Sequence, residues 1–361
     1  NAINVKPSNK NLIVGDITIP SELSGHSVVS IGNSAFQYCS SLTSINIPEG
    51  VTSIGNSAFS YCRDLTSINV PEGVTSIGNY AFYTCDSLTS INIPGGVTSI
   101  EDSTFSGCSR LANIEIPSSV TSIGNSAFSG CSKLTSIEIP SGVTSIGNSA
   151  FYNCSSLTGI NVAENNQNYC SEDGVLFNKD KTKLIRYPSE KLDKQYVIPS
   201  SVTSIGNYAF EDCSNLTSIE IPSSVISIGN YAFISCSSLT SIEIPEGVTS
   251  IGEYAFSHCS SLTSIEISSS VTSIGNGAFL YCDNLTIICK SDSYAYSFAK
   301  ENNINVDTSE QTIVKFNDEN LYSRIKEICN DLGKVKDYND EKREITINII
   351  KEIKSLDLSN S

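Results

Sequence analysis

The sequence predicts a solenoid, a stack of short coils with a parallel β-sheet on the concave face and short turns or strands on the convex face. A motif close to V-T-S-I-G-N-S-A-F returns with a period of 23 residues. The second half of each copy repeats one apolar pattern. Trp and Met are absent and aromatic residues make up only 8% of the chain, which suits thin stacked layers better than one deep core. The ten copies open at Val28, Val51, Val74, Val97, Val120, Val143, Val202, Val225, Val248 and Val271.

The second half of each copy predicts a β-strand. It reads L-x-x-I-x-I-P, as in Leu42, Ile45, Ile47 and Pro48. The two Ile residues alternate with polar neighbours, as a strand with one buried face requires. Proline then ends the strand because it cannot donate to the ladder. The first half, with its irregular apolar spacing, predicts a tight return across the back of the coil.

The regular array spans residues 28–306 and is flanked by different segments. Residues 1–27 predict a cap or half-repeat, in which Ile17 and Ile19 imitate a strand end. In the tenth copy Lys290 replaces the last strand Ile, and Ser291 to Lys300 predicts a short helix that covers the final layer.

One insertion interrupts the array, because 59 residues separate Val143 from Val202. Its residues at about 163–199 predict a β-hairpin, with strands at Val175–Phe177 and Leu184–Ile185. Two interpretations stay open, a tolerated insertion and a projecting contact element. Six basic residues favour the second: Lys179, Lys181, Lys183, Arg186, Lys191 and Lys194.

Residues 307–361 have a different pattern. Leu321, Ile325, Ile328 and Leu332 mark one face of a helix that ends at Gly333. A second helix is expected from Glu341 to Glu352, and I-x-x-L-x-L at 353–358 looks like the first strand of another repeat.

The C-x-x-L-x-x-I-x-I-P and V-x-x-I-G-x-x-A-F motifs resemble those of the BspA-like leucine-rich repeats of bacterial and some protozoan surface proteins. The resemblance covers about residues 15–306. It implies a leucine-rich-repeat solenoid and a role in adhesion or host-protein binding, with no catalytic residues. The end of the chain, residues 307–361, resembles the helical cap of internalin-type repeats, which implies a second array.

Ten of the 13 Cys residues occupy one repeat position. Metal sites need clustered ligands such as C-x₂₋₄-C, and the sequence has none. Side chains in a ladder point in parallel, whereas a disulfide needs converging Cβ atoms. The sequence therefore predicts buried, reduced thiols that pack as small hydrophobes. They are Cys39, Cys62, Cys85, Cys108, Cys131, Cys154, Cys213, Cys236, Cys259 and Cys282.

The motifs of an active site are missing. The only histidines are His26 and His258, and neither accompanies a nucleophile motif such as G-x-S-x-G. The Gly-Asn pairs are turn residues. They are not a phosphate-binding loop, because the G-x-x-x-x-G-K-[ST] pattern is missing. The sequence therefore predicts no enzyme, and neither a catalytic nor a metal site.

The residues that flank the first strand Ile must point away from the core. One column of them changes from Asn to Glu along the array, and it predicts a polar binding face. Its members are Asn46, Asn69, Asn92, Glu115, Glu138, Glu220, Glu243 and Glu266. A second column, Tyr80, Tyr208, Tyr231 and Tyr254, is either a contact surface or a packing column on the back.

Charge narrows the class of partner. The chain carries a net charge of −16, and residues 28–162 and 200–288 alone hold 16 acidic and 3 basic side chains, a net charge of −13. Such a surface disfavours nucleic acid and anionic membranes. A basic protein surface is expected instead, or Ca²⁺ in an acidic groove, with no other cofactor.

The predicted function is a protein-binding or adhesion module of a cell-surface or secreted protein, with host or extracellular-matrix proteins as partners. The sequence has no run of about 18 apolar residues, so it predicts no membrane-spanning helix. Two alternatives stay open. One is a passive spacer that holds another domain away from the cell surface. The other is a non-catalytic part of a larger enzyme.

Overall fold

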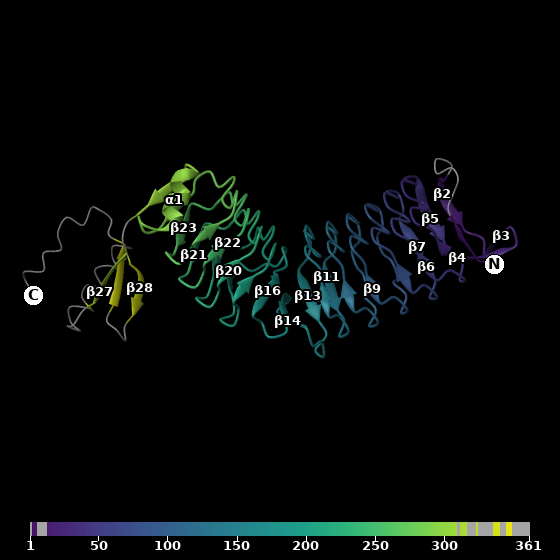
Figure 1. The fold of residues 1–361 in the computed structure, drawn as a ribbon, viewed down its shortest axis with the longest axis horizontal. Coiled ribbons are helices and arrows are strands. Elements are labelled where there is room, and N and C mark those ends of the chain that lie inside the picture. The colour runs from purple at the N-terminus through teal and green to yellow at the C-terminus, as the bar shows by residue number, and fades with distance from the viewer. Residues whose placement is uncertain are drawn as a thin grey trace, which may run out of the picture.

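The computed structural model describes residues 13–308, residue 323 and the backbone of four strands outside that range, β1 (Ala2–Val5), β27 (Gln311–Lys315), β28 (Val335–Asn339) and β29 (Glu344–Asn348). The described chain forms an elongated solenoid of about 13 turns (Figure 1). Strand β2 (Gly15–Thr18) lies at one end of the stack and helix α1 (Tyr294–Glu301) at the other (Figure 1).

The predicted strands form the first column of the solenoid and pair in parallel. Equivalent residues face each other, for example Ile45 with Ile68 and Ile242 with Ile265. The column contains β2, β5 (Leu42–Asn46), β7 (Ser67–Asn69), β11 (Ser136–Ile139), β13 (Gly159–Val162), β17 (Gln195–Val197), β19 (Ser218–Glu220), β21 (Ser241–Ile244), β23 (Ser264–Ile267), β25 (Thr286–Ile288) and β26 (Asn305–Asp307).

This column is not one continuous sheet. Residues 88–94 and 111–117, which carry the strand motif of the third and fourth copies, form no regular ladder. The distance from the Thr66 nitrogen to the Thr43 oxygen is 2.9 Å, whereas the corresponding bond from Ala112 to Thr89 lengthens to 3.4 Å. The layers therefore separate slightly on this face while the side chains Ile91 and Ile114 stay buried.

A second parallel column follows the V-x-x-I-G half of each copy. Its strands are mostly two residues long, because the chain turns at the following Gly. At Gly55 a Cβ atom would lie 2.7 Å from the backbone nitrogen of Asn33, so the close approach of successive layers requires glycine. The column contains β4 (His26–Ile31), β6 (Ser53–Ile54), β8 (Ser76–Ile77), β9 (Ser99–Ile100), β10 (Ser122–Ile123), β12 (Ser145–Ile146), β16 (Lys183–Arg186), β18 (Ser204–Ile205), β20 (Ser227–Ile228), β22 (Ser250–Ile251) and β24 (Ser273–Ile274).

The core is a set of ladders in which each apolar side chain packs on its own copy one layer away. The rings of Phe36 and Phe59 stack with centroids 5.3 Å apart and planes inclined by 5°. Phe105 and Phe128 repeat this geometry at 5.8 Å and 7°. Burying each such side chain stabilises the fold by roughly 1.5–3 kcal/mol, so the repeat itself supplies the driving force.

The insertion forms a hairpin, as predicted, but it does not project. Strand β14 (Tyr169–Glu172) pairs antiparallel with β15 (Val175–Asn178), β15 pairs antiparallel with β16, and β16 joins the second column beside β18. Phe177 and Leu184 are fully buried. Because alternate residues of β15 face opposite ways, Leu176 packs into the core before the insertion, and Val175 and Phe177 pack into the core after it.

Both ends of the array are covered. At the start, β2 adds a strand whose Ile17 faces Ile45, and the antiparallel strand β3 (Glu22–Leu23) pairs with β4. At the far end, helix α1 confirms the helix expected at Ser291 to Lys300. Ser293 caps it, its hydroxyl accepting from the Tyr296 N–H at 3.3 Å. The Phe298 ring then meets Phe279 edge-on at 6.1 Å.

The two helices predicted within residues 307–361 have different outcomes. The helix expected from Glu341 to Glu352 is wrong over β29, which pairs antiparallel with β27 and β28. The segment I-T-I-N-I at 345–349 alternates apolar and polar residues, a strand pattern that outweighs its helical spacing. The helix expected over Leu321 to Leu332 lies almost wholly outside the described residues, so the internalin-type cap stays a prediction.

Candidate binding surface

The eight residues of the predicted polar column all lie on the strand face. Seven are exposed and Glu266 is half-buried. In the paired strands, Asn46 lies directly beside Asn69, and Glu243 lies directly beside Glu266. Like charges opposite each other on adjacent strands repel, so the Glu243–Glu266 pair favours a cationic partner. The other members are Asn92, Glu115, Glu138 and Glu220.

The insertion divides the acidic part of this column. Glu138 faces Asn161 on β13, and Glu220 faces Val197 on β17. The Val197 side chain is 63% exposed. Two uncharged residues therefore stand between the acidic groups before and after the insertion, and the larger acidic group lies after it.

A groove of about 540 Å³ lies at the carboxyl ends of β21, β23 and β25. Besides Glu243 and Glu266, its walls include Glu246 and Asp292, with Lys290 as the one cation among its lining residues. The column continues past Glu266 through Ile288 to Asp307 in the strand register. Sequence analysis missed Glu246 and Asp292 because they lie outside the repeated strand position, and Asp307 because β26 follows the last copy of the repeat.

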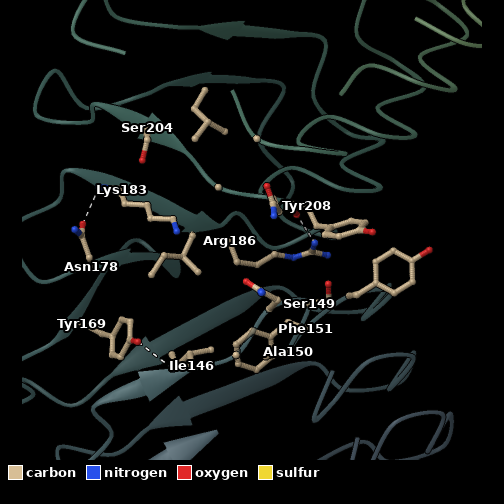
Figure 2. A pocket seen from close by; sticks show the side chains of 18 of the residues that line it. Ile146, Ser149, Ala150, Phe151, Tyr169, Asn178, Lys183, Arg186, Ser204 and Tyr208 are labelled. Atoms are coloured by element: carbon tan, nitrogen blue, oxygen red, sulfur yellow. Dashed lines mark hydrogen bonds between the residues drawn. The ribbon is translucent and has the colours of Figure 1, made fainter. Parts of the chain in front are cut away.

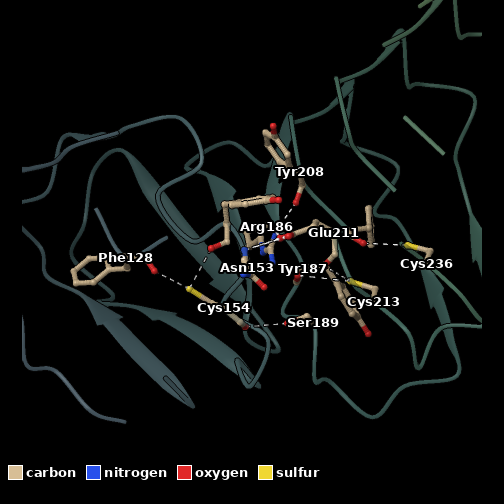
Figure 3. Close-up of polar contacts among 12 residues, drawn as sticks. Phe128, Asn153, Cys154, Arg186, Tyr187, Ser189, Tyr208, Glu211, Cys213 and Cys236 are labelled. Atoms are coloured by element: carbon tan, nitrogen blue, oxygen red, sulfur yellow. Dashed lines mark hydrogen bonds and ion pairs between the residues drawn. The ribbon is translucent and has the colours of Figure 1, made fainter. Parts of the chain in front are cut away.

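A buried ion pair marks the junction between the insertion and the seventh copy. The Arg186 Nη1 atom lies 2.8 Å from Glu211 Oε2 and donates to the Tyr208 carbonyl at 2.6 Å (Figure 3). Glu211 also accepts from the Asn153 N–H at 3.0 Å. Burial raises the pKa of the Glu211 carboxyl, and the Arg186 charge and the Asn153 N–H oppose that shift.

The sequence placed Arg186 among the basic residues of a projecting element, and the structure buries it instead. In the other layers, the position of Arg186 belongs to a small uncharged residue, usually a buried Ala such as Ala209, and the position of Glu211 belongs to an uncharged residue such as Ser129. The visible signal was that Glu211 is the one charged residue at this repeat position. Of the other cations, Lys191 pairs with Asp173 and Asp193, and Lys181 with Glu172.

The repeated cysteines form no disulfides and are buried, as predicted. They also have a polar role that the sequence did not reveal. The Cys62 thiol donates to the Phe36 carbonyl of the preceding layer at 3.1 Å, and Cys108 donates to Phe82 at 3.2 Å. Burial raises the pKa of the Cys154 thiol to about 12. The Cys154 thiol is therefore a protonated hydrogen-bond donor at neutral pH.

The tyrosine column is both stacked and partly exposed. Tyr208 and Tyr231 lie 4.8 Å apart with planes inclined by 2°, and Tyr231 and Tyr254 lie 5.1 Å apart. Tyr80 belongs instead to a separate group, where it meets Tyr83 edge-on at 5.7 Å. The column therefore packs on itself and still offers ring edges to solvent.

We also searched the described residues for a metal site, an unusual histidine and a membrane-spanning helix. In residues 13–308, no group of three or more His, Cys, Asp or Glu side chains has the geometry of a metal site. His258 is exposed and stacks on Tyr281 with centroids 4.4 Å apart. The described part of the chain contains no helix that is long and apolar enough to cross a membrane.

Repeating parallel layers with this strand motif define the chain as a leucine-rich-repeat solenoid. The family described as BspA type leucine rich repeat region (6 copies) matches residues 29–158, 75–195 and 187–305. The chain belongs to this family. No curated protein matches the chain significantly.

Solved structures agree with this assignment. A leucine rich cell surface protein from Faecalibacterium prausnitzii is 34% identical, with a TM-score of 0.69, over 82% of this chain and 88% of that one. A leucine-rich repeat protein from Eubacterium ventriosum is 29% identical, with a TM-score of 0.58, over 80% and 72% of the two chains. The pneumococcal vaccine antigen PcpA, 21% identical with a TM-score of 0.56 over 85% and 92%, shares the fold.

Proposed function

We propose that this chain is a non-catalytic, protein-binding module of a cell-surface or secreted protein, and that its acidic strand face contacts a basic segment of a host or matrix protein. The observation that carries the proposal is the acidic group after the insertion. Glu220, Glu243 and Glu266 lie there in one column, and the groove beside the last two adds Glu246 and Asp292.

The physical basis is charge complementarity. Residues 200–288 contain eight acidic and no basic side chains. An unbalanced field of this kind accelerates encounter with cationic partners and repels anionic ones. The stack fixes the backbone that carries the carboxylates, so this side of the interface loses little ordering entropy when an extended basic segment binds. The cell-surface relative from Faecalibacterium prausnitzii supports a location outside the cell.

A charge-matched pair of variants tests this proposal. A fluorescently labelled decalysine peptide is titrated against wild-type protein and the triple variant E220Q/E243Q/E266Q at low ionic strength, with anisotropy as the readout. Removing three carboxylates from the contact face should weaken binding about tenfold or more, because each close charge pair contributes roughly 0.5–1 kcal/mol at a partly exposed site. The difference should shrink as salt screens the interaction.

The control variant E49Q/D64N/D283N changes the net charge equally at three exposed sites outside the column that contains Glu220, Glu243 and Glu266. Its affinity should stay within about twofold of wild type once salt is raised to about 0.1 M, where the Debye length shortens to about 10 Å. Equal weakening in both variants would show that the peptide senses only net charge. No binding by the wild type would favour the spacer function. Competition by millimolar Ca²⁺, but not by matched ionic strength, would assign the groove to the ion.

A further inference from the structure

The layer supplied by the insertion is shorter than the layers around it. Leu184 on β16 faces Ile205, and the Tyr187 N–H donates to the Ala209 carbonyl, as the Phe59 N–H does to Ala81. Two residues connect Leu184 to Tyr187, whereas four connect Ile205 to Phe210. The inserted layer therefore lacks the Gly-Asn turn of the repeat.

A ladder of asparagines breaks where this turn is missing. In regular layers each Asn side chain accepts the N–H of the next Asn, and the last such bond before the insertion runs from the Asn148 N–H to Asn125 Oδ1 at 2.9 Å. The ladder resumes with the Asn230 N–H and Asn207 Oδ1 at 2.9 Å. Between Asn148 and Asn207 the missing rung leaves a pocket of about 430 Å³, which is drawn in Figure 2.

The pocket is cationic in a strongly acidic protein. Lys183 and Arg186 line it, and none of its lining residues is acidic. Figure 2 shows the Lys183 side chain extending along the pocket toward Arg186. The Arg186 side chain is only 4% exposed, and its Nε and Nη2 atoms have no hydrogen-bond partner among the described residues. The Nη1 atom of Arg186 is already paired with Glu211, so Lys183 is the cation that a bound group in the pocket meets.

The remaining lining residues have the chemistry of a carbohydrate site. Tyr152, Tyr169 and Tyr208 supply aromatic surface, and the rings of Tyr152 and Tyr208 meet at 4.9 Å across the missing layer. Neutral hydrogen-bonding side chains complete the wall: Asn148, Ser149, Asn178, Ser204, Asn207 and Ser227. The volume is within the range of small-ligand pockets, about 300–1,000 Å³.

We propose that this pocket binds an acidic sugar residue. The carboxylate pairs with the Lys183 ammonium, as in other charge-assisted pairs. The sugar ring packs against the parts of the Tyr152, Tyr169 and Tyr208 rings that line the pocket, and its hydroxyl groups exchange hydrogen bonds with the Asn and Ser side chains. The pocket lies in the second column, apart from the acidic groove, so this inference stands separately from the proposed function.

The test titrates glucuronate into the folded protein and follows binding by calorimetry and by NMR, beside glucose and succinate. Saturable binding of glucuronate at least about tenfold tighter than that of either control is expected, since only glucuronate carries both a carboxylate and a hydroxyl-bearing ring. Lys183→Gln should weaken binding about tenfold. Lys194→Gln, which alters an exposed lysine of the same insertion away from the pocket, should bind as wild type.

A second variant tests the location without changing charge. Ser149→Tyr places in the pocket the residue that Tyr80 and Tyr208 provide at the same repeat position, with the same positive φ. It should fold and should abolish binding by filling the space. Absence of saturable glucuronate binding, equal binding of succinate or glucose, or unchanged affinity in Lys183→Gln or in the folded Ser149→Tyr variant would each overturn the proposal.

Discussion

In the regular layers from Val51 to Val143, each coil residue meets its own equivalent one layer away, whereas the junction layer at 181–190 meets unlike residues on both sides. At the positions of Arg186 and Glu211, the regular layers have uncharged residues, Ala or Thr at the first position and Ser or Tyr at the second. At the junction Arg186 and Glu211 take those positions, and a pocket opens beside them. A single non-equivalent layer therefore concentrates polar chemistry in one place.

The same contrast extends to the core. Within the described chain, the buried apolar residues form one cluster that ends at Leu176 and a second that begins at Val175. Contacts in a repeat array couple mainly neighbouring layers, so a weak junction lowers cooperativity along the stack. The insertion is therefore the place where mutations should separate the two halves of the solenoid.

The largest effect is expected for Glu211→Ala, which leaves the Arg186 charge buried without its partner. It should lower the free energy of unfolding by about 3–5 kcal/mol. Ser129→Ala, at the same repeat position in a regular layer, should change it by less than about 0.5 kcal/mol. Urea denaturation followed by circular dichroism measures both. Similar values for the two variants would contradict the contrast between junction and regular layers.

A smaller effect is expected within the asparagine ladder. Asn125→Ala removes the acceptor of the Asn148 N–H and should cost about 1 kcal/mol. Asn148→Ala should cost less than about 0.5 kcal/mol, because within residues 13–308 the ladder breaks after the Asn148 N–H bond and resumes only at Asn207. Thermal denaturation of the two variants compares them. A loss in Asn148→Ala as large as in Asn125→Ala would show that the ladder continues across the pocket.

The smallest expected effect concerns the chemical reactivity of cysteines in the insertion and in the buried ladder, which can be compared without any mutation. Burial raises the pKa of Cys154 to about 12, so its reactive thiolate is scarce at pH 8 and becomes abundant only as pH approaches that value. Cys170 in the insertion is partly exposed. Brief iodoacetamide treatment at pH 8 should therefore modify Cys170 ahead of the buried ladder, as mass spectrometry would show.

Labelling in urea provides the control, since every thiol should then react. Native-state labelling of Cys154 as fast as that of Cys170 would indicate that the layers open readily.

The strands, the thiol ladder and the end helix were predictable because each rests on local pattern repeated many times. The two Ile residues of each strand motif alternate with polar neighbours, and the register follows once the copies stack. The hydrogen bond from Cys62 to Phe36 was not predictable, because it joins residues 26 positions apart instead of the 23 of the repeat. The pairing of Arg186 with Glu211 was missed for a related reason, since no periodicity relates the insertion to the seventh copy.

The sequence by itself determined the architecture of this protein: a period of 23 residues dictates which side chains are buried and which face outward in every copy. Only the tertiary structure decided where the stack fails to repeat. The two missing residues of the inserted layer, the pocket they leave and the groove at the far end arise from contacts between unlike layers. Local periodicity carries no information about such contacts, because they depend on which coil happens to lie next to which.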